Sequence, residues 1–600
     1  MSSSTNGMGD AGMVTIEATE NILFSGTNPN GFASGAVSDV NPGGKGNAGG
    51  LSIVASTVEV RDGAFLSSST NGMGDAGMVT IEATDTILFS GTNPDGFGSS
   101  VLSNVNSEGE GNAGDISIVA STIEVRDGAQ LSSSTRGMGN GGAVRVEATD
   151  TILFSGTDAD GFGSGAFSQL NSGGEGNAGD VSIVASTVEV RDGAQLSSST
   201  RGMGNGGAVR VEATDTILFS GSGAVSDVNP GGKGNAGDVS IVASTVEVRD
   251  GAVLSSRTFG MGNGGMVRVE ASDTILFSGT DADGSPSGAF SRVEPGGEGN
   301  AGDVSLVAST VEVRDGAALS SENVASFNAP DREFGNNFRA GNLIVQAESI
   351  QLTDEAAIIS NTRGQGGNIQ LNSGTIILRR NSNVRTNATG TFPGGNITMD
   401  TGTLAALENS DITANATNAA GGNVIINTQG IFGTEFREFE TPQSDITATG
   451  ATRELQGTVE INTPDVDSTQ GIIELPQTVT DPRELLSQNP CVQGADSEFS
   501  DIGTGGFPAG PDEPPTQAGV EASWIEFDTD DRPEPTTTLS STEFLDRPQP
   551  IVPARGWRLD DTGRVTFTAD DRETSVELPV SSTIFHRPDT ACSPRFRSGP

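Results

Sequence analysis

Residues 176–221 read GNAGDVSIVASTVEVRDGAQLSSSTRGMGNGGAVRVEATDTILFSG, and near copies of this stretch recur along the chain. The intervals between copies are 65, 65, 58 and 65 residues, and the short interval lacks the segment of the type TDADGFG. A regular period of this kind is typical of repeat architectures, in which each unit packs mainly on its neighbours. The copies open at Gly46, Gly111, Gly176, Gly234 and Gly299.

Each copy divides into two shorter units that share one template. A Gly-Asn turn leads into an alternating segment, residues 181–185 in the first unit and 209–213 in the second. A second alternating segment follows, 188–190 or 217–219. The first unit then adds a short strand at 194–198, whereas the second continues into a variable loop. Alternation with period two, broken by Gly, Asn and Asp, predicts strands joined by turns.

Units of about 27 residues with three short strands predict an all-β fold, a right-handed parallel β-helix. Each unit forms one coil, so each long repeat makes two coils. Roughly 15 coils, stacked about 4.8 Å apart, would form a solenoid on the order of 70 Å long. Small residues such as Ala185 and Ala213 suit a narrow interior, and Asn177, Asn205 and Asn235 are expected to form a hydrogen-bonded ladder. A β-propeller or sandwich is the rival fold, but stacking explains the near-identical copies better.

The template divides the chain into four segments. Residues 1–336 carry the long repeats of two coils each, and 337–477 continue the template as diverged coils. Residues 478–556 are rich in Pro, Asp and Gly, a linker composition that predicts a partly disordered region. The tail, 557–600, contains a predicted small β-hairpin with its turn at 561–563.

Composition excludes several classes of protein. Hydrophobic residues make up 34% of the chain and aromatic residues 5%, which favours a thin core continued lengthwise over a large spherical one. The formal charge of -46 repels phosphates, so neither nucleic acid nor an anionic membrane is expected as a partner. No stretch approaches 18 apolar residues, so no membrane-spanning segment is expected.

The beginning of the chain lies inside a repeat. Residues 2–16 are identical to residues 67–81, and no basic segment followed by an apolar one marks a signal peptide. We therefore interpret the chain as the downstream part of a longer protein, or as one with a misplaced start. The first coil would then have unpaired strand edges, which predicts self-association at that end.

Few residues offer site chemistry. Asp158, Asp160, Asp281 and Asp283 in two DADG segments are weak calcium candidates, because the remaining ligands of a calcium loop are missing. Cys491 and Cys592, which lie 101 residues apart, are candidate disulfide partners in an oxidising compartment.

The repeated carboxylates form columns and no unique cluster. Glu124, Glu189 and Glu247 are expected to stack on one outward face, with an outward Leu in each intervening coil. The only histidine is His586 in the tail, so neither a catalytic triad nor a histidine metal site can be assembled. We expect no enzymatic activity, no catalytic residues and no cofactor.

The C-terminal part of the chain resembles a known family. The sequences SDITATG (444–450), GTVEINTPDVD (457–467), IIELP (472–476) and DPRELL (481–486) are followed by Cys491, GTGGFPAGPDEP, a segment with Trp524, and a Gly-Trp strand before Cys592. This order resembles the filamentous haemagglutinin-like exoproteins of cyanobacteria, strongly over about 440–600 and moderately elsewhere. The resemblance implies two-partner secretion, in which an N-terminal domain, lacking here, engages an outer-membrane transporter, and it implies an extracellular or outer-membrane surface location.

These observations predict a non-enzymatic adhesin or cell-envelope filament that contacts surface glycans or proteins through loops such as 157–175 and 280–298. Three alternatives remain open. The chain could be a polysaccharide-active enzyme on the same fold, which a localised cluster of carboxylates and basic residues in one groove would favour. It could be a contact-dependent toxin carrier, against which the Pro-rich ending argues, or a truncated gene fragment without a function.

Overall fold

The computed structural model describes residues 1–28, 32–324, 338–464, 556–559 and 565–568. The chain separates into two compact units, residues 1–466 and 467–600. The segment boundaries predicted at 336 and 477, both cysteines and residues 478–555 of the predicted linker lie outside the described residues; Gly556, predicted as the end of the linker, begins β33. In the second unit, β33 (Gly556–Leu559) pairs antiparallel with β34 (Val565–Thr568), which are the two strands of the predicted hairpin.

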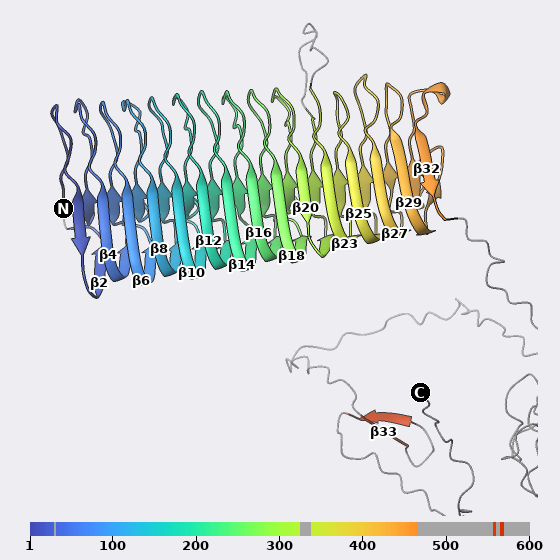
Figure 1. Cartoon of the computed structure of the whole chain (residues 1–600), viewed down its shortest axis with the longest axis horizontal. Helices are drawn as coiled ribbons and strands as arrows, with labels where there is room; N and C mark the ends of the chain where they lie inside the picture. Colours follow the sequence, from blue (N-terminus) through green and yellow to red (C-terminus); the bar gives the residue numbers. More distant parts are fainter. Residues whose placement is uncertain (29–31, 325–337, 465–555, 560–564, 569–600) are drawn as a thin grey trace, which may run out of the picture. The chain divides into compact units, whose positions relative to one another are not determined.

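The first unit is a parallel β-helix, as the repeat predicted. Its strands form two parallel sheets, of 17 and 15 strands, in which strands pair with the equivalent strands of neighbouring coils; β30, which pairs with β31 of the same coil, is the exception (Figure 1). Because β1 and β2 lie in one coil, and β20 and β21 in another, the 17 strands belong to 15 coils.

One long strand in each coil contributes to the first sheet. These strands are β1 (Val14–Glu17) with β2 (Asn21–Ser25), β4 (Leu51–Arg61), β6 (Val79–Ser90), β8 (Ile116–Arg126), β10 (Val144–Ser155), β12 (Val181–Arg191), β14 (Val209–Ser220), β16 (Val239–Arg249), β18 (Val267–Ser278), β20 (Val304–Val307) with β21 (Thr310–Arg314), β23 (Leu343–Thr353), β25 (Ile369–Leu378), β27 (Ile397–Ala406), β29 (Asn423–Phe432) and β32 (Thr458–Asn462).

Short strands that follow the long strands form the second sheet, one in each coil before that of β29, whereas both β30 and β31 follow β29, and a 3-10 turn, η1 (Arg453–Leu455), precedes β32. We call the outward side of this second sheet, together with the residues that follow each strand, the short-strand face. Its strands are β3 (Gly35–Val37), β5 (Phe65–Ser67), β7 (Ser100–Leu102), β9 (Gln130–Ser132), β11 (Gly165–Phe167), β13 (Gln195–Ser197), β15 (Gly223–Val225), β17 (Val253–Ser255), β19 (Gly288–Phe290), β22 (Ala318–Ser320), β24 (Ala357–Ile359), β26 (Asn383–Arg385), β28 (Ile412–Thr413), β30 (Glu435–Phe436) and β31 (Asp445–Thr447).

The long strand combines two predicted segments, joined at an irregular bend. The register of β12 with β14 shifts between Ala185 and Thr187, because β14 has one more residue at this point, Asp215. Ala185 is buried as expected, but Ala213, next to the longer bend, is only half-buried. A bulge of this kind bends a strand and leaves one residue unpaired, so it turns the chain from one side of the solenoid to the next.

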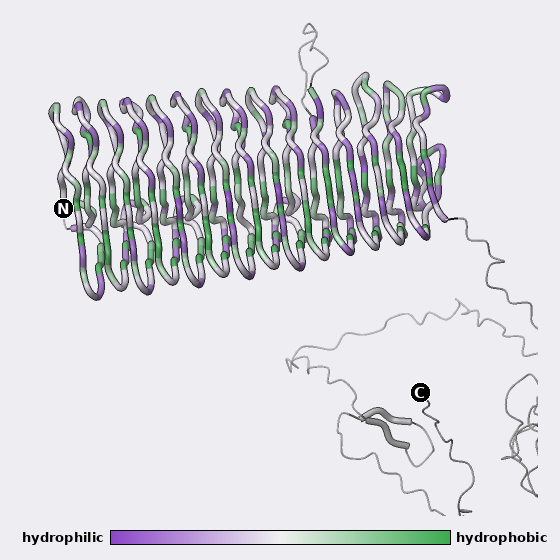
Figure 2. Tube along the Cα trace, viewed as in Figure 1, coloured by the Kyte–Doolittle hydropathy of each residue, from purple (hydrophilic) through white to green (hydrophobic). Residues whose placement is uncertain are grey.

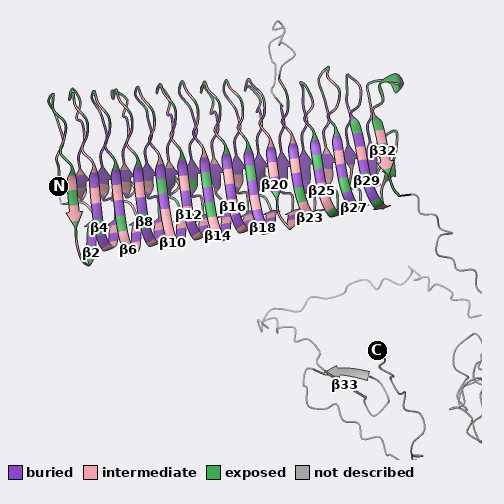
Figure 3. Ribbon diagram, viewed as in Figure 1, coloured by how far each residue is buried: buried purple, intermediate pink, exposed green. Residues whose placement is uncertain are grey.

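The core is a continuous stack of aliphatic side chains. Apolar segments recur at the same position in successive coils (Figure 2), and buried residues alternate with partly buried and exposed ones along the long strands (Figure 3). Large and small residues alternate along the stack: Phe219 lies between Val190 and Val248 of the neighbouring coils, and all three are buried. Such alternation fills a narrow interior without voids.

The turn between coils requires glycine. Gly204 has a φ of +153°, and a Cβ at this position would lie 1.4 Å from the carbonyl oxygen of Gly176 in the preceding coil. Neither the backbone angle nor the spacing tolerates a side chain. The repeated Gly-Asn pair is therefore needed for coil stacking.

The second unit of each repeat contains a strand that the sequence did not predict. Residues 223–225 form β15, which pairs in register with β13 and β17, although the equivalent segment was assigned to a variable loop. Three residues that include a glycine carry too little alternation to indicate a strand. The loop in these units is therefore shorter than expected, and it ends where the short strand begins.

Candidate functional site

Four loops of one design project from the solenoid between a long strand and a short strand. They span residues 27–33, 92–98, 157–163 and 280–286, and each begins and ends with an antiparallel bridge, such as Thr157 with Gly163; residues 29–31 of the first loop lie outside the described residues. In the third loop, Oδ1 of Asp158 accepts hydrogen bonds from the N–H groups of Asp160 at 3.0 Å and Phe162 at 2.8 Å. Asn93 makes the same two bonds in the second loop. An Asx side chain that closes its own turn fixes the loop conformation.

The first three loops each present an exposed phenylalanine. Phe32, Phe97 and Phe162 are 72%, 72% and 64% exposed, and they occupy equivalent positions two coils apart. The fourth loop has Ser285 at this position, and the 58-residue repeat replaces the whole loop with the dipeptide Gly221-Ser222. Exposed aromatic rings on fixed loops are costly to maintain in water and are enriched at binding surfaces.

A cavity of about 430 Å³ lies beside the third loop on the short-strand face. Its volume is in the range of small-molecule sites, about 300–1,000 Å³. Its walls combine Phe162 and Phe167 with amide, hydroxyl and guanidinium groups, and they include no Asp or Glu. The lining residues are Leu102, Asn104, Val105, Asn106, Gln130, Ser132, Ser134, Arg136, Phe162, Gly163, Phe167, Gln169, Asn171 and Gln195.

Several polar side chains that line this cavity have no hydrogen-bond partner among the described residues. Within the described part of the chain, the side chains of Asn106, Gln130 and Arg136 form no hydrogen bond or ion pair with protein. Oδ1 of Asn104, in contrast, accepts bonds from Ser132 Oγ at 2.9 Å and Ser134 N at 2.7 Å, whereas its Nδ2 has no partner among the described residues. The cavity therefore offers donors and acceptors that are free to bind a ligand.

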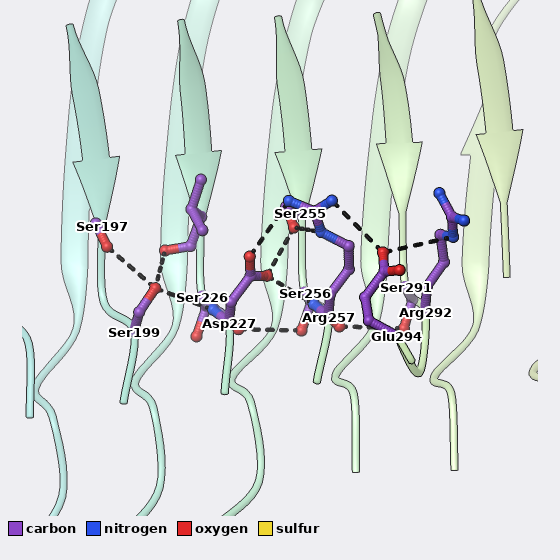
Figure 4. A network of polar contacts seen from close by, with 11 residues as sticks. Ser197, Ser199, Ser226, Asp227, Ser255, Ser256, Arg257, Ser291, Arg292 and Glu294 are labelled. Carbon is purple, nitrogen blue, oxygen red and sulfur yellow. Dashed lines mark hydrogen bonds and ion pairs between the residues drawn. The ribbon is translucent and has the colours of Figure 1, made fainter. Parts of the chain in front are cut away.

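The same face carries a charged network in later coils (Figure 4). Arg257 lies 3.5 Å from Asp227 and 3.6 Å from Glu294, and Arg292 lies 3.7 Å from Glu294 and 3.3 Å from Glu322. The three carboxylate side chains are only 6%, 12% and 9% exposed. This finding corrects our expectation that no localised set of carboxylates and basic residues exists.

Every carboxylate of the network is engaged within it. Asp227 Oδ1 accepts hydrogen bonds from Ser255 Oγ at 2.6 Å and from the backbone N–H of Arg257 at 2.7 Å, and Glu322 accepts one from Ser320 at 2.8 Å. The guanidinium of Arg257 also lies 5.9 Å from the centre of the buried Phe290 ring. A buried charge is tolerated when it is paired and hydrogen-bonded in this way. The network thus joins neighbouring coils.

Asp39 occupies the same column as Asp227 near the start of the chain. Its Oδ1 accepts hydrogen bonds from Ser67 Oγ and Ser69 N, both at 2.7 Å. Burial raises the pKa of Asp39, and these two hydrogen bonds offset part of that increase. In the turns that follow the long strands β23 and β27, hydrogen bonding to Arg380 lowers the pKa of Asp354, and hydrogen bonding to Arg379 lowers the pKa of Glu408.

The other residues predicted from the sequence have clear positions. The outward column alternates as expected, because Leu218 pairs with Glu189 on one side and Glu247 on the other, and Leu153 pairs with Glu124. Arg191 lies beside Glu189, with 3.3 Å between Nε and Oε2. The Asn ladder is also present, but its bonds run from backbone N–H to side-chain Oδ1.

The calcium candidates lie at the tips of two loops. Asp158 and Asp281 use Oδ1 to close their own turns, and Asp160 and Asp283 donate backbone N–H groups to those oxygens. Calcium binding by these residues remains a prediction. Among the described residues, no group of three or more His, Cys, Asp or Glu side chains is placed to hold a metal ion.

Comparisons of the chain with protein-family models, with curated proteins and with solved structures found no match. Within the described ranges, no helix has the length and apolar character that crossing a membrane requires.

Proposed function

We propose that this chain is a non-enzymatic adhesin, displayed on the outer surface of the cell or secreted, which holds other surfaces through its phenylalanine loops and the adjoining short-strand face. The observation that carries the proposal is the row of Phe32, Phe97 and Phe162, all exposed and all held on loops of the same design. The resemblance of residues 440–600 to filamentous haemagglutinin-like exoproteins supports export through an outer-membrane transporter.

The repeated arrangement gives a mechanism for adhesion. Two coils separate successive phenylalanines, which corresponds to about 10 Å along the solenoid. Contacts repeated at a fixed spacing on a stiff scaffold act at high effective concentration, so individually weak contacts combine into durable attachment. The variation among repeats agrees with this role: the segment 181–191 is almost unchanged in other copies, whereas the short-strand face differs, as in QLSSSTR (195–201) and VLSSRTF (253–259).

The experiment deletes the loops in the way that the 58-residue repeat naturally lacks one. Removing residues 157–163 joins Gly156 to Ser164 and reproduces the loopless connection Gly221-Ser222, so the fold is expected to survive. A strain lacking the gene would be complemented with the native chain, or with a chain lacking 27–33, 92–98 and 157–163. Auto-aggregation and retention on glass under flow would then be measured.

The matched control lacks residues 280–286, a loop of equal length and closure without a phenylalanine. The proposal predicts that the native chain and the control restore attachment and that the triple deletion does not. Equal attachment by all three strains would contradict a role of the aromatic loops. Attachment that is unchanged by loss of the whole gene would contradict the adhesin itself.

A second candidate, a polysaccharide-active enzyme, is favoured by one observation. Asp227, Glu294 and Glu322 are gathered around Arg257 and Arg292 on one face, and clustered carboxylates and basic residues are the groups that cleavage of acidic glycans requires. The mutual pairing of these groups favours the adhesin instead. Release of reducing ends from polygalacturonate by the full chain, abolished by Asp227→Asn, would establish the enzyme.

A further inference from the structure

We propose that the cavity beside Phe162 binds a neutral polysaccharide, which runs along the solenoid across successive phenylalanine loops. This inference rests on the proposed function, and it names the ligand class and the place where the ligand binds. Four features of the cavity lead to it: its aromatic wall, its unoccupied polar groups, its lack of carboxylates and its periodic surroundings.

The aromatic wall fits a sugar ring. Phe162 is 64% exposed and lines the cavity, while the hydrogen bonds to Asp158 hold its backbone in place. The apolar C–H face of a pyranose packs on an aromatic ring and buries its surface without disturbing the hydroxyl groups at the ring edge. Because the loop is already fixed, little conformational entropy is lost when the sugar binds.

The polar groups fit the sugar hydroxyls. Gln130 offers an amide oxygen and nitrogen, and Arg136 offers several N–H donors, none of which is used within the described part of the protein. Each hydroxyl of a sugar donates and accepts hydrogen bonds, and amide side chains can satisfy both. Arg257 differs from Arg136, because its guanidinium is paired with two carboxylates. Arg257 therefore connects neighbouring coils, whereas Arg136 can bind a ligand.

The charge distribution favours a neutral glycan. The chain has 78 acidic residues and a formal charge of -46, yet none of the residues that line the cavity is acidic. The field of the whole protein repels a polyanion, and a single exposed arginine does not offset that field. A neutral polymer avoids this repulsion and still receives hydrogen bonds from Arg136.

The spacing favours a polymer over a single sugar. Phe32, Phe97 and Phe162 recur every second coil, about 10 Å apart, which is similar to the length of a disaccharide unit in an extended chain. One polysaccharide that follows the row of loops would meet the same ring at each step. Binding at successive loops then reinforces itself through effective concentration.

The test is affinity electrophoresis of the full chain in gels that contain single polysaccharides. The neutral probes are mixed-linkage β-glucan, glucomannan, galactomannan and arabinoxylan, and the acidic probes are alginate and polygalacturonate. Retardation by at least one neutral probe is expected. Phe162→Ala should weaken that binding about three- to tenfold. The matched control is Phe439→Ala, because Phe439 is 65% exposed but lies outside the cavity, and it should leave retardation unchanged.

The outcomes separate this inference from the proposed function. Retardation by a neutral probe that Phe162→Ala and Gln130→Ala both weaken, with unchanged circular dichroism spectra, would support the cavity as the binding site. Retardation by acidic probes only, by none of the probes, or equally for native chain and variants would overturn it. The adhesin would survive those results if the triple loop deletion still abolished attachment of cells.

Discussion

The backbone N–H of Asn205 donates a hydrogen bond of 2.9 Å to Oδ1 of Asn177, the residue at the same corner of the preceding coil. The same bond joins Asn177 to Asn140 at 2.9 Å, and Asn235 to Asn205 at 2.8 Å. Each asparagine thus satisfies a backbone donor that no strand pairs, and it does so for the next coil. The Gly-Asn repeat in the sequence is therefore a connection between coils as well as a turn.

Replacing Asn177 with Ala should weaken the next coil at this corner. The N–H of Asn205 loses its acceptor, at a cost of about 1 kcal/mol for an exposed hydrogen bond. Hydrogen–deuterium exchange of the turn at Asn205 should accelerate about fivefold. Asn229→Ala is the control, because the Asn229 side chain has no partner within the described residues. In this variant, exchange of the turn at Asn205 should equal that of the native chain. Equal exchange in both variants would show that the ladder contributes nothing.

Phe219→Ala should destabilise the coils on both sides of it. Phe219 is fully buried between Val190 and Val248, so truncation leaves a cavity and costs about 3–5 kcal/mol. In a solenoid the loss is local, so exchange should increase in β12, β14 and β16 before the distant coils. The exposed Phe436 provides the comparison, since Phe436→Ala should change stability by less than about 0.5 kcal/mol. Uniform loosening of all coils would contradict nearest-neighbour packing.

Arg257→Ala should be far more damaging than loss of an exposed arginine. It leaves Asp227, whose side chain is 6% exposed, without its ion pair, at a cost of about 3 kcal/mol or more. Arg145→Ala breaks an exposed pair with Glu147 and should cost about 1 kcal/mol or less. Thermal unfolding followed by circular dichroism separates the two variants.

Another coil shows which double substitution should restore the stability that Arg257→Ala removes. The double variant Asp227→Asn with Arg257→Ser reproduces the neutral pair Asn104 and Ser134, which occupies the same column earlier in the chain. We expect it to recover most of the stability lost in Arg257→Ala. A double variant as unstable as the single one would show that the charges are needed for more than mutual neutralisation.

Asp39→Asn should change how the stability of this coil depends on pH, because it removes a buried carboxyl group. Because burial raises the pKa of Asp39 above its ordinary value of 3.8, the folded coil binds the proton more tightly than the unfolded chain. Its contribution to stability is therefore present below pH 3.8 and is lost as pH rises through the pKa of the folded state. Asn does not titrate, and Asn104 shows that it keeps the same hydrogen bonds.

The stability difference between Asp39→Asn and the native chain should accordingly grow as pH rises above 3.8 and vanish below it. The lowered pKa values of Asp354 and Glu408 act in the opposite direction, but they affect both proteins equally and cancel in the difference. Local exchange at the N–H of Ser69 measures the effect. A difference that grows as pH falls would mean that the carboxylate is stabilised in the folded chain.

The fold could be predicted because every coil repeats the same local signals. Alternation in 181–190 and the Gly-Asn turn agree with the stacking that the structure shows. The pairing of Glu189 with Leu218 followed from aligning the two units of the repeat. The buried serines were missed: Ser198 donates to Gly179 O and accepts from Gly207 N inside the solenoid, although serine is usually a surface residue.

The candidate site was harder to predict because its residues are distant in the sequence. Asp227, Arg257 and Glu294 meet only when their coils are stacked in the observed register, in which β15, β17 and β19 pair as neighbours. The cavity likewise combines Gln130 of one coil with Phe162 of the next. A sequence motif could have revealed one part of the site, since the Gly-Phe pair recurs at Phe32, Phe97 and Phe162 in otherwise polar loops.

Immunogold labelling of intact producing cells tests the central claim most directly. Antibodies raised against residues 343–432, which lie in well-defined coils away from the aromatic loops, would be applied before and after permeabilisation. The adhesin account predicts gold particles on the outside of intact cells, at a density that permeabilisation does not raise, and none on a strain lacking the gene. Labelling that appears only after permeabilisation would contradict it, because a protein held inside the cell cannot attach one surface to another.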